Sequence, residues 1–270
     1  MKADIINAVK SVAEQEGMLM GVASADALNA KAPHGFRPMD LMPGARSVIV
    51  FAKPLPLAVF LAPDGFNNMF YQRSAYTYYL LMDKVADKAS MMIQEGGYLA
   101  LPVPAYSPLR FHEGEPKGAI SLKHAAAEAG LGKLGRNSLL INQEHGIAMR
   151  LGALMTEMEW SEYAPAVGFE PCPEKCHVCE QACPIGAIND GKVNKIACLG
   201  KCIKHILLPP SFMLPAVKKA VARSRMLTRF MELVSLNFFE TYGINCTACL
   251  KACPHFLDKS KSLKNRDRTT

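Results

Sequence analysis

The stretch CPEKCHVCEQACP, residues 172–184, decides how the rest of this 270-residue sequence is interpreted. Its four cysteines follow the spacing C-x3-C-x2-C-x3-C, and a proline comes directly after the last one. All nine cysteines of the chain lie between Cys172 and Cys253, so the first 171 residues contain none. An odd number of cysteines leaves one thiol over in a disulfide framework. The clustered cysteines therefore predict a metal site.

A second stretch, CTACLKACP at residues 246–254, repeats the C-x2-C-x3-C-P half of this pattern. Ferredoxins with two clusters carry C-x2-C-x2-C-x3-C-P, in which the fourth cysteine binds the other cluster. Residues 172–184 differ by one extra residue in the first gap. Zinc is the main alternative for C-x2-C pairs. Two Cys-Pro endings at the same offset favour two [4Fe–4S] clusters over zinc.

Crossed sharing between the two stretches predicts the ligands of each cluster, since every iron of a cubane needs one thiolate. The first cluster would take four cysteines: Cys172, Cys176, Cys179 and Cys253. The second would take three cysteines and one more from the segment between the motifs: Cys183, Cys246 and Cys249, with either Cys198 or Cys202. The spacing alone leaves the choice between Cys198 and Cys202 open.

The composition is that of an ordinary globular protein, with half of the residues hydrophobic. The net charge of +7 weakly favours an acidic partner, such as a flavodoxin or ferredoxin that donates electrons, and does not predict nucleic-acid binding. No uncharged apolar run reaches the roughly 18 residues of a membrane span. Residues 1–17 read as an amphipathic helix rather than a signal peptide. We therefore expect a cytoplasmic protein.

Residues 1–165 alternate helical and strand patterns without a regular βαβ rhythm, which favours an α+β domain. Strands are expected at residues 18–23, 47–52, 98–103, 138–141 and 147–156, and helices at residues 72–95 and 121–129. The apolar stripe expected to face the core from the longer helix comprises Leu80, Leu81, Val85, Ala89, Met92 and Ile93. A second domain is expected over residues 166–258, followed by a polar tail at 259–270.

A helical insert at about residues 203–240 interrupts the cysteine-rich region. Its helical block, roughly residues 214–239, combines apolar positions with many basic side chains. One interpretation is a helix that binds a membrane surface or an acidic partner. The simpler interpretation, an amphipathic helix packed on its own protein with a solvated basic face, is favoured.

The stretch GLGKLG, residues 130–135, matches the dinucleotide pattern G-x-G-x-x-G. That motif must follow a strand and open a helix. Here it follows the expected helix and leads into an expected strand, so the order is reversed and NAD or FAD is not predicted. The glycines Gly130, Gly132 and Gly135 allow close approach to a flat or bulky group, or they form a helix C-cap and turn.

Several stretches together resemble the epoxyqueuosine reductase and reductive dehalogenase superfamily: residues 37–52, 118–141, 145–160 and 176–188. The resemblance implies a nitroreductase-like domain that binds cobalamin, followed by a ferredoxin-like domain with two [4Fe–4S] clusters that reduce the corrinoid. The resemblance also implies that Cys198 is the one cluster ligand outside the two motifs. Cys202 would then bind no cluster. The resemblance further implies that the loop containing Gly130, Gly132, Gly135 and Asn137 lies against the corrinoid.

The sequence departs from the epoxyqueuosine reductases where those enzymes carry an aspartate acid. Pro116 is nearest to that place, and none of the neighbours Glu113, Glu115 and Lys117 matches it. Epoxyqueuosine is therefore not predicted as the substrate. A reductase needs a proton donor near the reacting atom. The candidates in the preceding loop and helix are Tyr106, His112, Lys123 and His124.

These observations predict an iron–sulfur oxidoreductase that passes single electrons through two [4Fe–4S] clusters to a corrinoid-type site. Its substrate would be an unidentified small molecule or the corrinoid itself. The alternative is a protein without substrate chemistry of its own, which either transfers electrons or reduces a corrinoid for another enzyme. Whether the chain is an enzyme is left open by the sequence.

Overall fold

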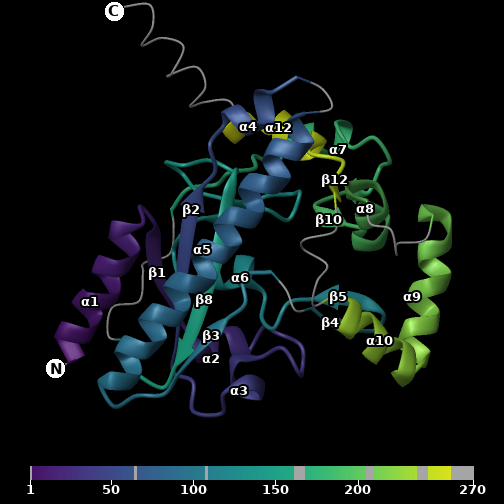
Figure 1. Cartoon of the computed structure of the whole chain (residues 1–270). Helices are drawn as coiled ribbons and strands as arrows, with labels where there is room; N and C mark the ends of the chain where they lie inside the picture. Colours follow the sequence, from purple (N-terminus) through teal and green to yellow (C-terminus); the bar gives the residue numbers. More distant parts are fainter. Residues whose placement is uncertain are drawn as a thin grey trace, which may run out of the picture.

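A four-stranded antiparallel sheet forms the centre of the molecule (Figure 1). The computed structural model describes residues 2–63, 66–106, 109–160, 168–204, 210–235 and 243–256. The strands run in the order β1 (Leu19–Ser24), β2 (Ser47–Pro54), β8 (Met149–Thr156) and β3 (Ala100–Val103). Ile49 of β2 lies opposite both Val22 of β1 and Leu154 of β8, which fixes the register of the three longer strands.

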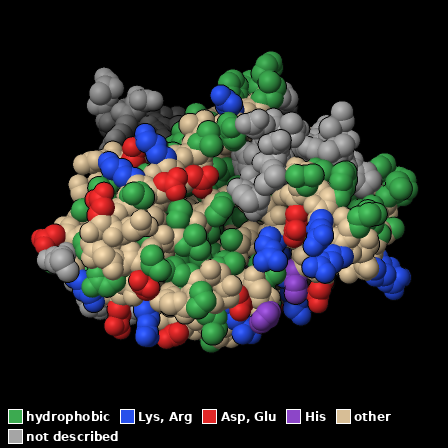
Figure 2. Space-filling view, turned by 60° about the horizontal axis from the view of Figure 1, so that its bottom comes forward, with side chains coloured by type: hydrophobic (Ala, Val, Ile, Leu, Met, Phe, Trp, Pro, Cys, Tyr) green, Lys and Arg blue, Asp and Glu red, His purple; other side chains and the backbone are tan. Residues whose placement is uncertain are grey.

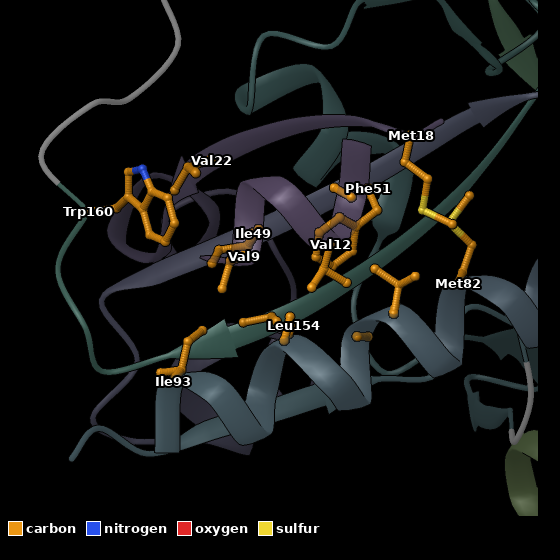
Figure 3. Packing of buried hydrophobic residues seen from close by; sticks show 14 of the residues in the cluster. Val9, Val12, Met18, Val22, Ile49, Phe51, Met82, Ile93, Leu154 and Trp160 are labelled. Carbon is orange, nitrogen blue, oxygen red and sulfur yellow. The ribbon is translucent and has the colours of Figure 1, made fainter. Parts of the chain in front are cut away.

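Helices cover both faces of this sheet. Side chains on a strand alternate between its faces, so the apolar strands present apolar side chains on both faces, and both are buried. Ile49 and Phe51 of β2 point toward α1 (Lys2–Gln15) and the long helix α5 (Asn67–Glu95). Figure 3 shows them packed with side chains of both helices and with Leu154. Val48 and Val50 belong to the opposite core, with α2 (Ala25–Asn29) and α6 (Leu122–Glu128). Both faces of β2 are therefore buried.

Helix α6 approaches the sheet closely because the residues in contact are small. Ala125, Ala126 and Ala129 are buried at the contact. A Cβ atom at Gly21 of β1 would lie only 2.3 Å from the carbonyl oxygen of Ala129. This close approach fixes the position of α6, which carries Lys123, and of the glycine-rich stretch that follows it.

Short elements complete the first part of the chain: α3 (Pro38–Leu41), α4 (Ala58–Leu61), and the two-stranded hairpins β4 (Arg110–His112) with β5 (Glu115–Lys117) and β6 (Lys133–Leu134) with β7 (Leu140–Ile141). The cysteine-rich part contains α7 (Val178–Gln181), β9 (Ile188–Asn189), β10 (Lys192–Val193), α8 (Lys195–Cys202), β11 (Ile203–Lys204), η1 (Ser211–Met213), α9 (Leu214–Arg223), α10 (Arg225–Ser235), β12 (Gly243–Ile244) and α12 (Ala248–Ala252). Figure 1 shows α9 and α10 at the far right, away from the sheet.

A third hydrophobic cluster joins the two parts of the chain. It combines Phe60, Tyr71 and Ile141 of the first part with Leu250 and Phe256. The rings of Phe60 and Phe256 meet edge to face, with their centroids 5.3 Å apart. This cluster holds α12, and with it the second cysteine motif, against the first part.

The prediction of mixed α and β structure is confirmed. Three details differ. Leu80 is 52% exposed, so it does not belong to the core stripe of α5. The strand expected at residues 138–141 is reduced to β7, and the expected single helix at 214–239 is two helices separated at Ser224, whose backbone is extended. Residues 236–239, the boundary at 161–167 and the tail at 259–270 lie outside the described residues, and the division into domains stays a prediction.

None of the helices in the described ranges is both long enough and apolar enough to cross a lipid bilayer.

Candidate metal centre and adjoining cavity

Four cysteines from both motifs line one small cavity: Cys172, Cys176, Cys179 and Cys253. Helix α7 places Cys179 in its first turn, and Cys253 is the residue at which α12 ends. The pKa of Cys253 is raised to about 11, by burial first and then by the neighbouring thiols of Cys172, Cys179 and Cys176. The fold therefore brings together the four thiols that crossed sharing predicts for the first cluster.

The glycine-rich hairpin packs directly against this group of cysteines. The backbone N–H of Arg136 donates to Cys172 Sγ at 3.5 Å, and a Cβ atom at Gly135 would lie 3.5 Å from the same sulfur. The Arg136 guanidinium donates to the carbonyl oxygen of Glu174 at 2.9 Å. Hydrogen bonds to a cluster sulfur and its ligands tune the reduction potential of an iron–sulfur centre.

The remaining cysteines form a second group around α8 and α12. Cys198 and Cys202 lie one turn apart on α8, with their sulfurs 3.5 Å from each other. The pKa of Cys249 is raised to about 12, by burial and then by the thiols of Cys198 and Cys246. Cys183 Sγ accepts a hydrogen bond from the backbone N–H of Ala187 at 3.2 Å.

Cys198 and Cys202 differ in their electrostatic surroundings. A hydrogen bond with Cys202 and the positive charge of Lys123 lower the pKa of Cys198 to about 7 against the effect of burial. The same hydrogen bond and burial raise the pKa of Cys202. The thiolate is the form that binds metal. The positive charge of Lys123 favours the thiolate form of Cys198, and the assignment of Cys198 as the cluster ligand stays a prediction.

Within the ranges that the structure describes, no three His, Cys, Asp or Glu side chains converge on a point where a single ion would be held. A structural zinc ion needs such convergence, with four tetrahedral ligands around one atom. A cubane differs, because its thiolates bind separate iron atoms at separate corners. The choice between a [4Fe–4S] cluster and zinc therefore stays a prediction.

A larger cavity of about 430 Å³ lies between the sheet and the cysteine-rich part. Among its lining residues are side chains from four helices and strands: Tyr71 and Tyr79 of α5, Lys123 of α6, Arg150 of β8 and Leu250 of α12. Leu250 directly follows Cys249 in the sequence. The cavity is of the size of small-molecule pockets, and Leu250 in its wall is the sequence neighbour of a cysteine of the second group.

Arg150 and two tyrosines form a packed group in this cavity. The Arg150 guanidinium donates to the Tyr71 hydroxyl. It also lies over the rings of Tyr71 and Tyr79, at 4.9 Å and 5.4 Å from their centroids. Burial raises the pKa of Tyr79. The group presents flat aromatic surfaces beside a positive charge.

Lys123 lies between this cavity and α8. Its Nζ donates to the backbone oxygen and to Oγ of Ser138, both at 2.8 Å. Burial lowers the pKa of Lys123, the charge of Lys195 lowers it further, and Cys198 opposes the shift. Lys123 is thus a positively charged or proton-donating group at the boundary between the cavity and the second group of cysteines.

The other proton-donor candidates predicted from the sequence differ in whether they line this cavity. Tyr106 lines the cavity together with Lys123, and its ring lies 5.3 Å from that of Tyr79. His112 lies in β4 and packs edge to face against Phe36, with ring centroids 5.4 Å apart. The Nδ1 atom of His124 is hydrogen-bonded to Ser121 Oγ at 2.6 Å. The structure brings Tyr106 and Lys123 together at the cavity, whereas His112 and His124 are not among the residues that line it.

The glycine-rich stretch lies beside the first group of cysteines. A Cβ atom at Gly132 would lie 2.3 Å from the carbonyl oxygen of Ile141, and Gly132 and Gly130 both have positive φ. Asn137 lines the small cavity and its Oδ1 accepts from the N–H of Leu139 at 3.2 Å. The close packing within the β6–β7 hairpin therefore explains by itself why residue 132 is a glycine. The expected contact between this stretch and a corrinoid stays a prediction.

Sequence reasoning missed Tyr71, Tyr79 and Arg150. Arg150 is the only charged residue in the apolar run at 147–156, which is a signal for a buried charge with a role. The tyrosines carry a weaker signal, since aromatic residues on a long helix are ordinary core residues.

No family model matches the chain. The tetrachloroethene reductive dehalogenase of Desulfitobacterium hafniense is 31% identical over 164 residues, which are 60% of this chain and 26% of that protein. The epoxyqueuosine reductase of Francisella cf. novicida is 24% identical over 184 residues, or 64% of this chain and 47% of that protein. The chain thus matches about a quarter of the dehalogenase and about half of the epoxyqueuosine reductase.

Solved structures show the same fold. The epoxyqueuosine reductase from Streptococcus thermophilus superposes with a TM-score of 0.57 at 19% identity, covering 95% of this chain and 66% of that one. The enzyme from Bacillus subtilis gives 0.57 at 18% identity, covering 96% and 66%. The sequence matches and the shared fold confirm the resemblance: this chain is similar in sequence and fold to epoxyqueuosine reductases, and similar in sequence to reductive dehalogenases.

Proposed function

We propose that this chain is an oxidoreductase that carries single electrons through two [4Fe–4S] clusters to a corrinoid of which one part enters the 430 Å³ cavity. The observation that supports this proposal best is the position of Leu250. It lines the same cavity as Lys123 and Arg150, and it directly follows Cys249 in the sequence. Electrons held by the second group of cysteines would thus arrive beside the cavity.

The cysteines would hold the clusters in the crossed arrangement. Cys172, Cys176, Cys179 and Cys253 would bind the first, and Cys183, Cys198, Cys246 and Cys249 the second. Bound [4Fe–4S] clusters supply one-electron transfer at potentials set by their surroundings. The N–H groups of Arg136 and Ala187, which donate to Cys172 and Cys183, would stabilise the negative charge on those sulfurs.

The cavity residues would hold and serve a flat cofactor. Tyr71 and Tyr79 supply aromatic surface, and Arg150 supplies a fixed positive charge beside them. A bound corrinoid would supply the cobalt-centred reduction. Lys123 is the better-placed proton donor, because burial lowers its pKa and eases the loss of its proton. Tyr106 is the second candidate.

The proposal includes a nitroreductase-like domain over residues 1–165 and a ferredoxin-like domain over residues 166–258, in a cytoplasmic protein. The substrate would be a small molecule or the corrinoid itself. Pro116 lies in β5 and pairs with Phe111, and it offers no acid where epoxyqueuosine reductases carry one. We therefore do not propose epoxyqueuosine as the substrate.

Cobalamin retention tests this proposal. The anaerobically purified, reduced chain is incubated with cobalamin and desalted, and the cobalt is quantified. We expect about one cobalt per chain. Leu122→Trp, which places a large side chain at the cavity wall, should abolish retention, and Leu99→Trp at an exposed position should preserve it. Cobalt loss from the wild-type chain alongside intact clusters would contradict the corrinoid site and leave an electron-transfer protein.

A further inference from the structure

Helix α10 turns its polar side chains toward the rest of the protein. Ser235 is buried, and its Oγ accepts from the N–H of Leu109 at 3.0 Å and donates to the carbonyl oxygen of the same residue at 3.1 Å. Glu232 Oε1 accepts from the N–H of Phe111 at 3.4 Å. Thr228 is half-buried and donates to the carbonyl oxygen of Val221 at 2.9 Å. The inner side of α10 thus carries these polar groups together with the half-buried Met231 and Val234.

Other apolar side chains of the same helix face outward. Met226, Phe230 and Leu233 recur at helical spacing and are 77%, 57% and 65% exposed. Arg225 and Arg229 are exposed next to them. Figure 2 shows hydrophobic and basic side chains together at the right of the molecule, where α9 and α10 lie in Figure 1. An amphipathic helix normally buries its apolar side chains, so the exposure of these three indicates an external partner.

The charge of this region identifies the class of partner. Residues 191–231 contain nine Lys and Arg and no Asp or Glu. This positive charge exceeds the +7 of the whole chain, so the rest of the chain is slightly acidic. Lys218 is tied to Glu115 by a 2.6 Å ion pair that anchors α9 to β5, whereas Lys219 and Arg223 extend the exposed basic surface. The surface is complementary to an acidic one.

A second copy of this chain would fit poorly. In a two-fold dimer the same patch meets itself, so Arg225 and Arg229 would face like charges. The exposed residue types of α10, which are Arg, Met, Phe and Leu, include those enriched in protein interfaces. They favour an acidic protein over a lipid surface as the occupant.

The location indicates what kind of acidic protein would bind. Helix α9 packs on α8, where a Cβ atom at Gly200 would lie 2.6 Å from Leu214 Cδ1. Helix α8 carries Cys198 and Cys202. A protein bound to α9 and α10 would therefore lie on the side of the molecule where the second cluster is proposed.

We propose that α9 and α10 form the docking surface for an acidic one-electron carrier protein. This proposal rests on the proposed function, because it concerns how electrons reach the chain. The carrier loses one electron and this chain gains one, with no bond formed or broken. Arg225 and Arg229 attract the carrier, and Met226, Phe230 and Leu233 form the apolar centre of the contact.

The test uses the anaerobic full-length chain and an acidic flavodoxin, with binding measured by calorimetry at two salt concentrations. The double substitution Arg225→Glu with Arg229→Glu should raise the dissociation constant at least about tenfold at low salt. Phe230→Ser should weaken binding at both salt concentrations. The matched control, Lys84→Glu with Lys88→Glu on the exposed side of α5, changes the charge equally and should leave binding unchanged.

Separate readouts distinguish this proposal from the proposed function. Iron content and bleaching by dithionite report on the clusters, whereas calorimetry reports on docking whether or not the clusters are present. Equal flavodoxin binding by the wild-type chain, the Arg variant and the Lys control would overturn the docking surface. Binding to phosphatidylglycerol vesicles that only the Arg variant loses, with flavodoxin binding unaffected, would also overturn it and assign the surface to a membrane.

Discussion

At the scale of single residues, Cys198 and Cys202 present the same chemical group in different surroundings. Both lie on α8, one turn apart, near Cys246 and Cys249. Only Cys198 has its pKa lowered by Lys123, which itself reaches the cavity. A ligand must be ionised to bind iron, so the charge of Lys123 favours Cys198, and Cys202 as the cysteine that binds no cluster stays a prediction.

Serine substitution tests this assignment. Cys202→Ser should keep the iron content of the wild-type chain. Cys198→Ser should lose about half of the iron, because the second cluster would lack one of its four thiolates. Iron and labile sulfide are quantified after anaerobic purification. Loss of iron from Cys202→Ser with none from Cys198→Ser would reverse the assignment.

At the scale of elements, the central strands depend on burial of both faces. Leu154 of β8 is fully buried in the cluster that joins β2 to α1 and α5. Removing its side chain leaves a cavity between these elements, and substitutions of this kind cost about 2–5 kcal/mol.

Leu154→Ala should therefore lower the free energy of unfolding by about 3 kcal/mol. Urea denaturation can be followed by the fluorescence of Trp160, the single tryptophan, which is buried in the same cluster. The matched control is Leu80→Ala on α5, which is half exposed and should cost much less. Equal effects of the two substitutions would show that the sheet is not packed as described.

The sequence predicted the elements whose burial leaves a strong pattern. Residues 47–52 are apolar and rich in β-branched side chains, and residues 147–156 are mostly apolar and follow a turn. These stretches form the central strands β2 and β8. The motif spacing predicted which thiols gather around the small cavity. The strand expected at residues 138–141 became the shorter β7, and its partner β6 was not predicted because a two-residue strand is too short to show alternation.

The orientation of α10 could not be predicted from its periodicity. The favoured expectation was a helix packed on its own protein with a solvated basic face. In α10 the expected inner positions Met231 and Val234 are half-buried and Arg225 and Arg229 are exposed, whereas Phe230 is 57% exposed. Periodicity shows that a helix has two faces, but the face that turns inward depends on distant partners. Here the N–H groups of Leu109 and Phe111 bind Ser235 and Glu232, more than a hundred residues away.

At the scale of the whole molecule, three places take part in the proposed electron transfer. The basic surface of α9 and α10 would receive the carrier, the two groups of cysteines would hold the electrons, and the cavity with Lys123 and Arg150 would use them. The structural match to epoxyqueuosine reductase covers nearly the whole chain, so both the sheet and the cysteine-rich part share that fold.

The central claim is that this chain holds two [4Fe–4S] clusters, and its most direct test is the iron and labile sulfide content of the anaerobically purified protein. The account predicts about eight irons and about eight sulfides per chain. Dithionite should bleach the visible absorbance that these clusters give. Stoichiometric zinc without labile sulfide would contradict the account.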